Sequence, residues 1–166
     1  RTGAIMSAIR VMLVDDHAVV RMGFKLLLQG ADDIEVVAEA ESGEEAIKRY
    51  PEIKPDVVVM DISMPGIGGL EAVSRLLAKD PAAKILILSA HEDSSHPKRL
   101  LKAGAVGYLS KRRAAEELIQ AIHQVSHGKT FLDSKLAQAM AVQQLTGEQN
   151  PVEVLSDREF EVFMLL

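Results

Sequence analysis

The sequence predicts an α/β fold, a doubly wound sheet of five parallel strands with a helix after each strand. Three observations support this prediction. Short runs rich in β-branched residues recur at a regular spacing, and the segments between them carry apolar residues at helical spacing. The runs are also nearly continuously apolar, as in VVVM and ILIL. That pattern is typical of parallel strands covered by helices on both faces.

The expected strands follow one another as a repeated strand–helix unit. They begin at Arg10 (RVMLV), Ile34 (IEVVAEA), Asp56 (DVVVMD), Lys84 (KILILSA) and Val106 (VGYLSK).

The expected helices lie in the gaps and bury one apolar face each. They cover residues 18–29, a segment opening at residue 42, and residues 70–79, 98–103 and 114–127. The second has a clear start signal, because Ser42 is followed by Glu45 in the spacing of a capping box.

Composition limits what the chain can be. Its 166 residues, 48% of them hydrophobic, suffice for one α/β domain and a further fragment. The absence of cysteine excludes disulfides and thiolate metal sites and favours a cytoplasmic location. A net charge of −5 argues against nonspecific binding to nucleic acid. No apolar run approaches the roughly 20 residues of a membrane span, so no membrane partner is expected.

Polar residues gather where the expected strands end. Strand one runs into Asp15 and Asp16, strand three ends at Asp61, strand four at Ser89 and strand five at Lys111. Ligands of such a sheet bind at this edge. Adjacent carboxylates repel one another and are costly to bury, which indicates a cation, and Mg²⁺ prefers carboxylates, water and a phosphate. A capping or loop role is the alternative for any one aspartate, but the set favours a site for Mg²⁺ and a phosphoryl group.

Four separated motifs, in this order, carry a resemblance to a known family. They are LVDDH (13–17), VVVMDISMPGIGGLE (57–71), ILILSA (85–90) and AGAVGYLSK (103–111). Over about residues 10–128 the chain resembles the receiver domain of a bacterial two-component response regulator. The resemblance implies a flavodoxin-like fold of five strand–helix units and a role in phosphorelay signalling.

The resemblance also implies roles for the acidic residues. Asp61 would be the phosphoacceptor, forming an aspartyl phosphate. Asp16 and Asp61 would bind Mg²⁺ directly, Asp15 mainly through water, and the backbone carbonyl of Ser63 would complete the protein ligands.

The remaining implied roles concern phosphoryl binding and switching. Lys111 would pair with the phosphoryl oxygens, Ser89 would hydrogen-bond the group, and the Tyr108 ring would follow Ser89. Simple packing at the sheet edge is the alternative for Tyr108. Many receivers have a proline with a cis bond after this lysine, whereas here Lys111 precedes Arg112, so the geometry of that peptide is left open.

The segment after the receiver suggests an output domain. We expect a receiver over residues 9–129, a helical linker over 130–153 and, over 154–166, the first helix of a truncated LuxR-type DNA-binding domain. Ser156 and Glu159 supply a second capping box. This helix resembles the NarL/FixJ family, and in detail the chain is most similar to the GacA/UvrY group, with its VDDH and MPGIGGLEA segments.

This family implies a switch and not an enzyme, with phosphorylation and dephosphorylation catalysed by the domain itself. A sensor histidine kinase would donate the phosphoryl group, and the phosphorylated form would be a homodimer. Only the full-length protein would bind DNA, because the chain ends before a recognition helix and its last segment is mainly acidic.

Three alternative functions compete with this one. A stand-alone receiver acting through protein contacts would lack the helix near the C-terminus. A Mg²⁺-dependent phosphatase of the haloacid dehalogenase class needs a second aspartate where Ser63 stands. A flavodoxin-like electron carrier needs a phosphate-binding loop after strand one, where the chain has DDHAVV.

Overall fold

The computed structural model describes residues 8–62, 68–90, 95–133 and, in the tail, 137–138, 141–142 and 145. The chain divides into two compact units, Arg1–Asp133 and Ser134–Leu166. The described tail residues are helical, and the extent of the predicted helical linker over 130–153 stays a prediction. The helix predicted over 154–166 lies outside the described residues. Among the described residues, no helix is long and apolar enough to cross a membrane.

The first unit is built on one parallel sheet. Its strand order is β2-β1-β3-β4-β5-β6, and every neighbouring pair is parallel. The strands are β1 (Ile9–Val14), β2 (Ile34–Ala40), β3 (Val57–Asp61), β4 (Ile85–Ser89), β5 (Gly107–Ser110) and β6 (Phe131–Leu132). The order reverses direction between β1 and β3, the switch point at which such sheets bind ligands.

The prediction of five strands was wrong by one. The sixth strand, β6, has two residues and pairs with β5 through Gly107↔Phe131 and Tyr108↔Leu132. A two-residue strand has no room for an alternating or continuous apolar pattern, and this one is held by the packing of Phe131 against the core and by backbone hydrogen bonds to β5.

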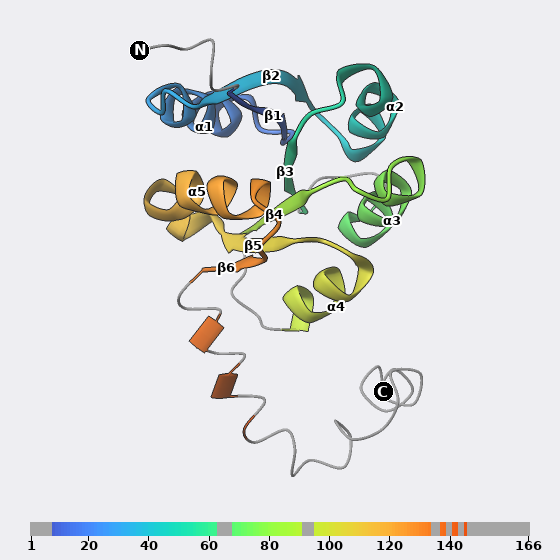
Figure 1. The fold of residues 1–166 in the computed structure, drawn as a ribbon, viewed down its shortest axis with the longest axis vertical. Coiled ribbons are helices and arrows are strands. Elements are labelled where there is room, and N and C mark those ends of the chain that lie inside the picture. Colours follow the sequence, from blue (N-terminus) through green and yellow to red (C-terminus); the bar gives the residue numbers. More distant parts are fainter. Residues whose placement is uncertain are drawn as a thin grey trace. The chain divides into compact units, whose positions relative to one another are not determined.

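Helices cover both faces of the sheet. They are α1 (Ala18–Gln29), α2 (Gly43–Ile53), α3 (Gly69–Lys79), α4 (Ser95–Ala103) and α5 (Lys111–Ser126). In Figure 1, α1 and α5 lie on one face and α2, α3 and α4 on the other. The bounds of α1 agree with the prediction, whereas α5 begins at Lys111 and not at Ala114. Lys111 is therefore the first residue of a helix, not the last of a strand.

The start of α2 is the predicted cap. The Ser42 hydroxyl accepts a hydrogen bond from the Glu45 backbone N–H at 3.1 Å. The Glu45 carboxylate accepts one from the N–H of Glu41 at 2.7 Å, one residue earlier than a standard capping box would give.

The central strands are buried along their whole length, as their continuous apolar sequences predicted. Every residue of β3 and β4 is buried. On the face covered by α5, the side chains of Leu118, Ile122 and Val125 pack with those of the sheet. Because packed interiors resist deformation, this core fixes the positions of the residues at the strand ends.

Candidate functional site

Three aspartates meet at the carboxyl ends of β1 and β3. Asp15 and Asp16 follow β1 directly, Asp61 ends β3, and these two strands are neighbours in the sheet. One ligand atom from each, together with one from His17, lies within 4.8 Å of the others. Asp15 and Asp61 are buried and Asp16 is half-buried. The cluster is therefore compact, negative and poorly hydrated.

Two carboxylate oxygens of this cluster suit a cation. Asp15 Oδ2 and Asp16 Oδ1 are buried and make no well-aligned hydrogen bond within the described residues, although Lys111 Nζ lies 3.2 Å from the first and His17 Nδ1 lies 3.1 Å from the second. Buried charged oxygens without such partners are costly, and a divalent cation would satisfy both. The residues present thus fit a metal ion held by carboxylates. Ser63, the predicted carbonyl ligand, lies outside the described residues.

Lys111 brings an ammonium group to the two buried acids. Its Nζ lies 3.1 Å from Asp61 Oδ2 and 3.2 Å from Asp15 Oδ2. Burial alone would lower the pKa of Lys111, but the hydrogen bond to Asp61 and the charges of both aspartates outweigh it and raise the pKa. The ammonium is therefore charged at neutral pH. The peptide between Lys111 and Arg112 is trans.

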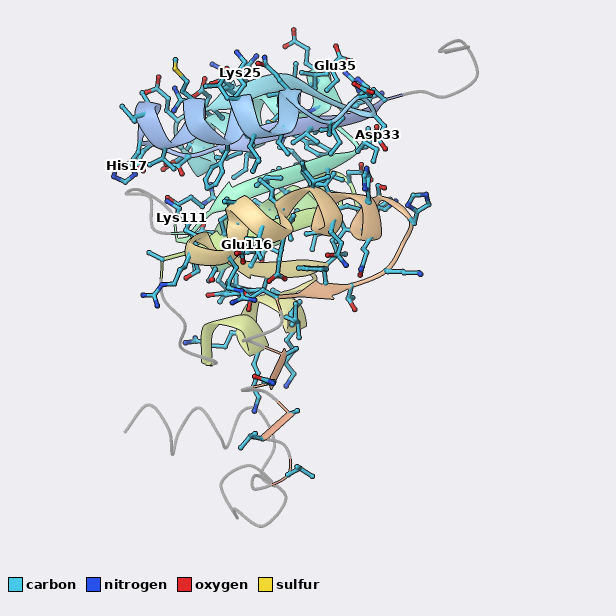
Figure 2. The ribbon with its side chains drawn as sticks, turned by 90° about the vertical axis from the view of Figure 1, so that its left-hand side faces the viewer. His17, Lys25, Asp33, Glu35, Lys111 and Glu116 are labelled. Carbon is cyan, nitrogen blue, oxygen red and sulfur yellow. The ribbon has the colours of Figure 1, made fainter. Side chains whose placement is uncertain are left out.

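His17 is a member of the cluster that the sequence analysis missed. Its Nδ1 lies 3.3 Å from Asp15 Oδ1 and 3.1 Å from Asp16 Oδ1, and its backbone N–H donates to Asp15 Oδ1 at 2.8 Å. The ring is 61% exposed. Figure 2 shows His17 and Lys111 toward the same end of the domain, with Asp33 at the opposite end. The one signal in the sequence that could have indicated His17 was its position directly after Asp15 and Asp16.

Arg21 of α1 supports the end of β1 and was also missed. Its guanidinium donates to the backbone carbonyl of Asp15 and, at 2.8 Å, to the carboxylate of Glu39 on β2. Hydrogen bonds from Arg21 and Lys25 lower the pKa of Glu39. The helix is thereby tied to both strands beside the acidic cluster.

Ser89 ends β4, the strand beside that of Asp61, and Tyr108 lies on β5, one strand further along the sheet. Asp61 pairs with Leu88 in the β3–β4 register, so Ser89 ends β4 one residue beyond that pair. Tyr108 pairs with Ile87 in the β4–β5 register. Both side chains are fully buried. The register places Ser89 at the same edge of the sheet as Asp61, while the switching roles of Ser89 and Tyr108 stay predictions.

This site and fold define the class of protein. Residues 11–123, well over half of the chain, match the family described as the response regulator receiver domain. The chain belongs to that family, and the flavodoxin-like receiver fold expected from the sequence is confirmed.

Within the family, the chain is similar to two groups of full-length regulators. It is 42% identical to the response regulator GacA of Pseudomonas viridiflava over 160 residues, which cover 95% of this chain and 75% of that protein. It is 41% identical to the response regulator UvrY of Escherichia coli (strain K12), again over 160 residues, covering 95% of this chain and 73% of that protein. The GacA/UvrY resemblance drawn from the motifs is confirmed.

A solved structure gives the same answer. The two-component response regulator of the LuxR family from Aurantimonas sp. SI85-9A1 superimposes with a TM-score of 0.81 at 40% identity. The match covers 84% of this chain and 99% of that one. The chain is therefore a response regulator receiver of the LuxR-family type.

Proposed function

We propose that Asp61 accepts a phosphoryl group from a sensor histidine kinase, with Mg²⁺ held by Asp15, Asp16 and Asp61. One observation carries the proposal: the Lys111 ammonium lies within 3.2 Å of both Asp15 and Asp61, beside carboxylate oxygens that suit a cation. A strand-end carboxylate beside the Lys111 ammonium, with carboxylates that would hold Mg²⁺ next to it, is suited to receive a group that brings negative charge with it. The Ser63 carbonyl is a further proposed ligand.

The transfer is a nucleophilic displacement at phosphorus. A carboxylate oxygen of Asp61 forms a bond to phosphorus, and the P–N bond to the kinase imidazole breaks. The imidazole leaves with that electron pair and takes up a proton, and Asp61 becomes an acyl phosphate. Lys111 pairs with the transferred oxygens, and bound Mg²⁺ supplies further positive charge to them.

The acyl phosphate then acts as a switch. The Ser89 hydroxyl hydrogen-bonds the phosphoryl group, and the Tyr108 ring follows that movement, so a local charge change biases a two-state packing arrangement. Water later releases phosphate. The domain modifies only its own residue and turns over no separate substrate, so we class it as a signalling module and not an enzyme.

The partners are those that this role requires. A sensor histidine kinase loads Asp61, the phosphorylated form is a homodimer, and a C-terminal DNA-binding domain of the full-length protein controls transcription. The names of its relatives support this reading, since GacA and UvrY are response regulators and the structural relative is of the LuxR family. A cytoplasmic location stays a prediction.

The test is the intact mass of the protein after incubation with Mg²⁺ and acetyl phosphate, a small phosphodonor. We expect one phosphoryl adduct on the wild-type chain and on Asp56→Asn, and none on Asp61→Asn or without Mg²⁺. Asp56 is a matched control, because it is an exposed aspartate directly before the opposite end of β3. No adduct on a folded wild-type chain would favour a receiver-like module that acts through protein contacts alone.

A further inference from the structure

A buried aspartate follows the last strand and reaches the turn that carries Lys111. Asp133, directly after β6, is fully buried. Its Oδ2 accepts a hydrogen bond from the Ser110 backbone N–H at 2.7 Å, and its own N–H donates to the Tyr108 carbonyl at 3.3 Å. Asp133 thus binds both the Tyr108 carbonyl and the Ser110 N–H of β5.

The carboxylate replaces a backbone group of the sheet. In a parallel pair of strands, a residue often makes two hydrogen bonds to the partner strand. Its N–H donates to the carbonyl of one partner residue, and its carbonyl accepts from the N–H of the partner residue two positions further along. The N–H of Asp133 bonds Tyr108, so its carbonyl would be the regular acceptor for Ser110. The side chain takes that N–H instead. The strand therefore ends in a charge-assisted bond, which is stronger than a neutral one.

This bond lies at the junction between β5 and α5. Ser110 precedes α5 as its N-cap, yet its own side chain makes no capping hydrogen bond. The Asp133 carboxylate lies at this helix N-terminus, where negative charge is favourable. The next residue, Lys111, places its ammonium between Asp15 and Asp61. The bond therefore fixes the backbone one residue before the lysine of the site.

We propose that Asp133 is a positioning residue for Lys111: by holding Ser110 N–H, it sets the start of α5 so that the Lys111 ammonium reaches Asp61. This inference rests on the proposed phosphorylation of Asp61.

The experiment compares phosphorylation by acetyl phosphate, followed by intact mass, across a Mg²⁺ titration. We expect Asp133→Ala to lower the rate at saturating Mg²⁺ about tenfold, since small misplacements of a reacting group cost this much or more. The Mg²⁺ concentration for half-maximal rate should not rise, because the carboxylates at the ends of β1 and β3 are not moved and a displaced Lys111 offsets less of their negative charge.

Three comparisons separate positioning from general loosening of the fold. Asp133→Asn keeps an acceptor for Ser110 N–H and should recover most of the rate. Asp32→Ala, a matched exposed aspartate in the loop before β2, should change nothing. Hydrogen exchange of the Ser110 amide, measured by NMR, should accelerate in Asp133→Ala and stay slow in Asp133→Asn. If Asp133→Ala does not fold, Asp133→Ser, whose hydroxyl is too short to reach, takes its place.

The inference fails if the alanine or serine variant keeps the wild-type rate. It also fails if the Mg²⁺ midpoint rises in proportion to the loss of rate, or if Asp133→Asn is no faster than Asp133→Ala. No adduct on the wild-type chain would overturn the proposed function, and this inference with it. If the wild-type chain is phosphorylated normally and the Asp133 variants keep the same rate, the inference alone is overturned and the proposed function stands.

Discussion

At the scale of residues, Lys111 determines the net charge that the acidic cluster presents. The Lys111 ammonium lies within 3.2 Å of two buried carboxylates, those of Asp15 and Asp61. The Asp16 carboxylate, which also has a buried oxygen, adds a third negative charge to the cluster. The site therefore remains negative with Lys111 in place, and it keeps an attraction for a divalent cation. Lys111 partly offsets the repulsion between the strand ends without removing it.

The Lys111 ion pairs should contribute measurable, pH-dependent stability. The pKa of Lys111 is raised above 10.5, so this contribution is fully present below about pH 10.5 and is lost as the pH rises through the folded-state pKa. We expect Lys111→Met to lower the free energy of unfolding at neutral pH by about 2 kcal/mol, between the values for exposed and buried pairs.

Urea unfolding between neutral pH and about pH 11.5 measures this difference. Lys79→Met, at an exposed position in the last turn of α3, is the control and should change little. A difference between wild type and Lys111→Met that stays constant above pH 10.5 would show that these ion pairs do not stabilise the fold.

The sequence identified most of these residues but not their full arrangement. Acids at the ends of apolar runs are visible in sequence, because strand ends of a parallel sheet share one edge. The role of His17 was not visible, because its contacts depend on a ring rotation that no periodicity encodes. The bond from Asp133 to Ser110 joins positions 23 residues apart, and nothing local predicts it.

At the scale of elements, helix starts are set by particular side-chain contacts. The Ser42 hydroxyl satisfies the Glu45 N–H, one of the donors that the first turn of α2 would otherwise leave unpaired. The backbone of Ser42 is extended, as in a standard N-cap. This was the helix start that the sequence signalled most clearly.

Removing that cap should cost stability without touching the site. We expect Ser42→Ala to lower the free energy of unfolding by about 1 kcal/mol. Ser74→Ala, at an exposed position inside α3, should be neutral or slightly stabilising, because alanine has the higher helix propensity. Thermal unfolding of the two variants beside the wild type measures the difference, and equal melting temperatures would contradict the role of the cap.

The elements show which sequence signals are dependable. Buried strands were found because four consecutive residues are apolar in both β3 and β4. The start of α5 was placed three residues late, because Lys111, Arg112 and Arg113 are polar and carry no apolar period. The Ser110 N–H, directly before this start, donates to the Asp133 carboxylate, which lies beyond the end of the same helix.

At the scale of the whole molecule, the sheet is a rigid support for one charged edge. Helices cover both faces, and the core holds β1, β3, β4 and β5 side by side. Asp15, Asp61 and Lys111 therefore meet as a consequence of topology and not of local sequence. A ligand that binds this edge should stabilise the entire fold, since the site exists only when the strands are paired.

Mg²⁺ should raise the melting temperature in a saturable way. At one hundred times its dissociation constant, a ligand that binds only the folded state adds about 2.7 kcal/mol to stability. The measurement is thermal unfolding over a Mg²⁺ titration, with NaCl at matched ionic strength as the control. Asp16→Asn should weaken the response. An equal rise with NaCl, or an undiminished rise in Asp16→Asn, would show that Mg²⁺ does not bind the acidic cluster.

The central claim is that Asp61 itself carries the phosphoryl group. An acyl phosphate is reduced by borohydride to the alcohol, which converts the modified aspartate into homoserine, and tandem mass spectrometry of peptides locates it. After incubation with Mg²⁺ and acetyl phosphate, we predict homoserine at position 61 alone, and none when Mg²⁺ is omitted. Homoserine at position 15 or 16, or at no position in a protein that carries the adduct, would contradict the account.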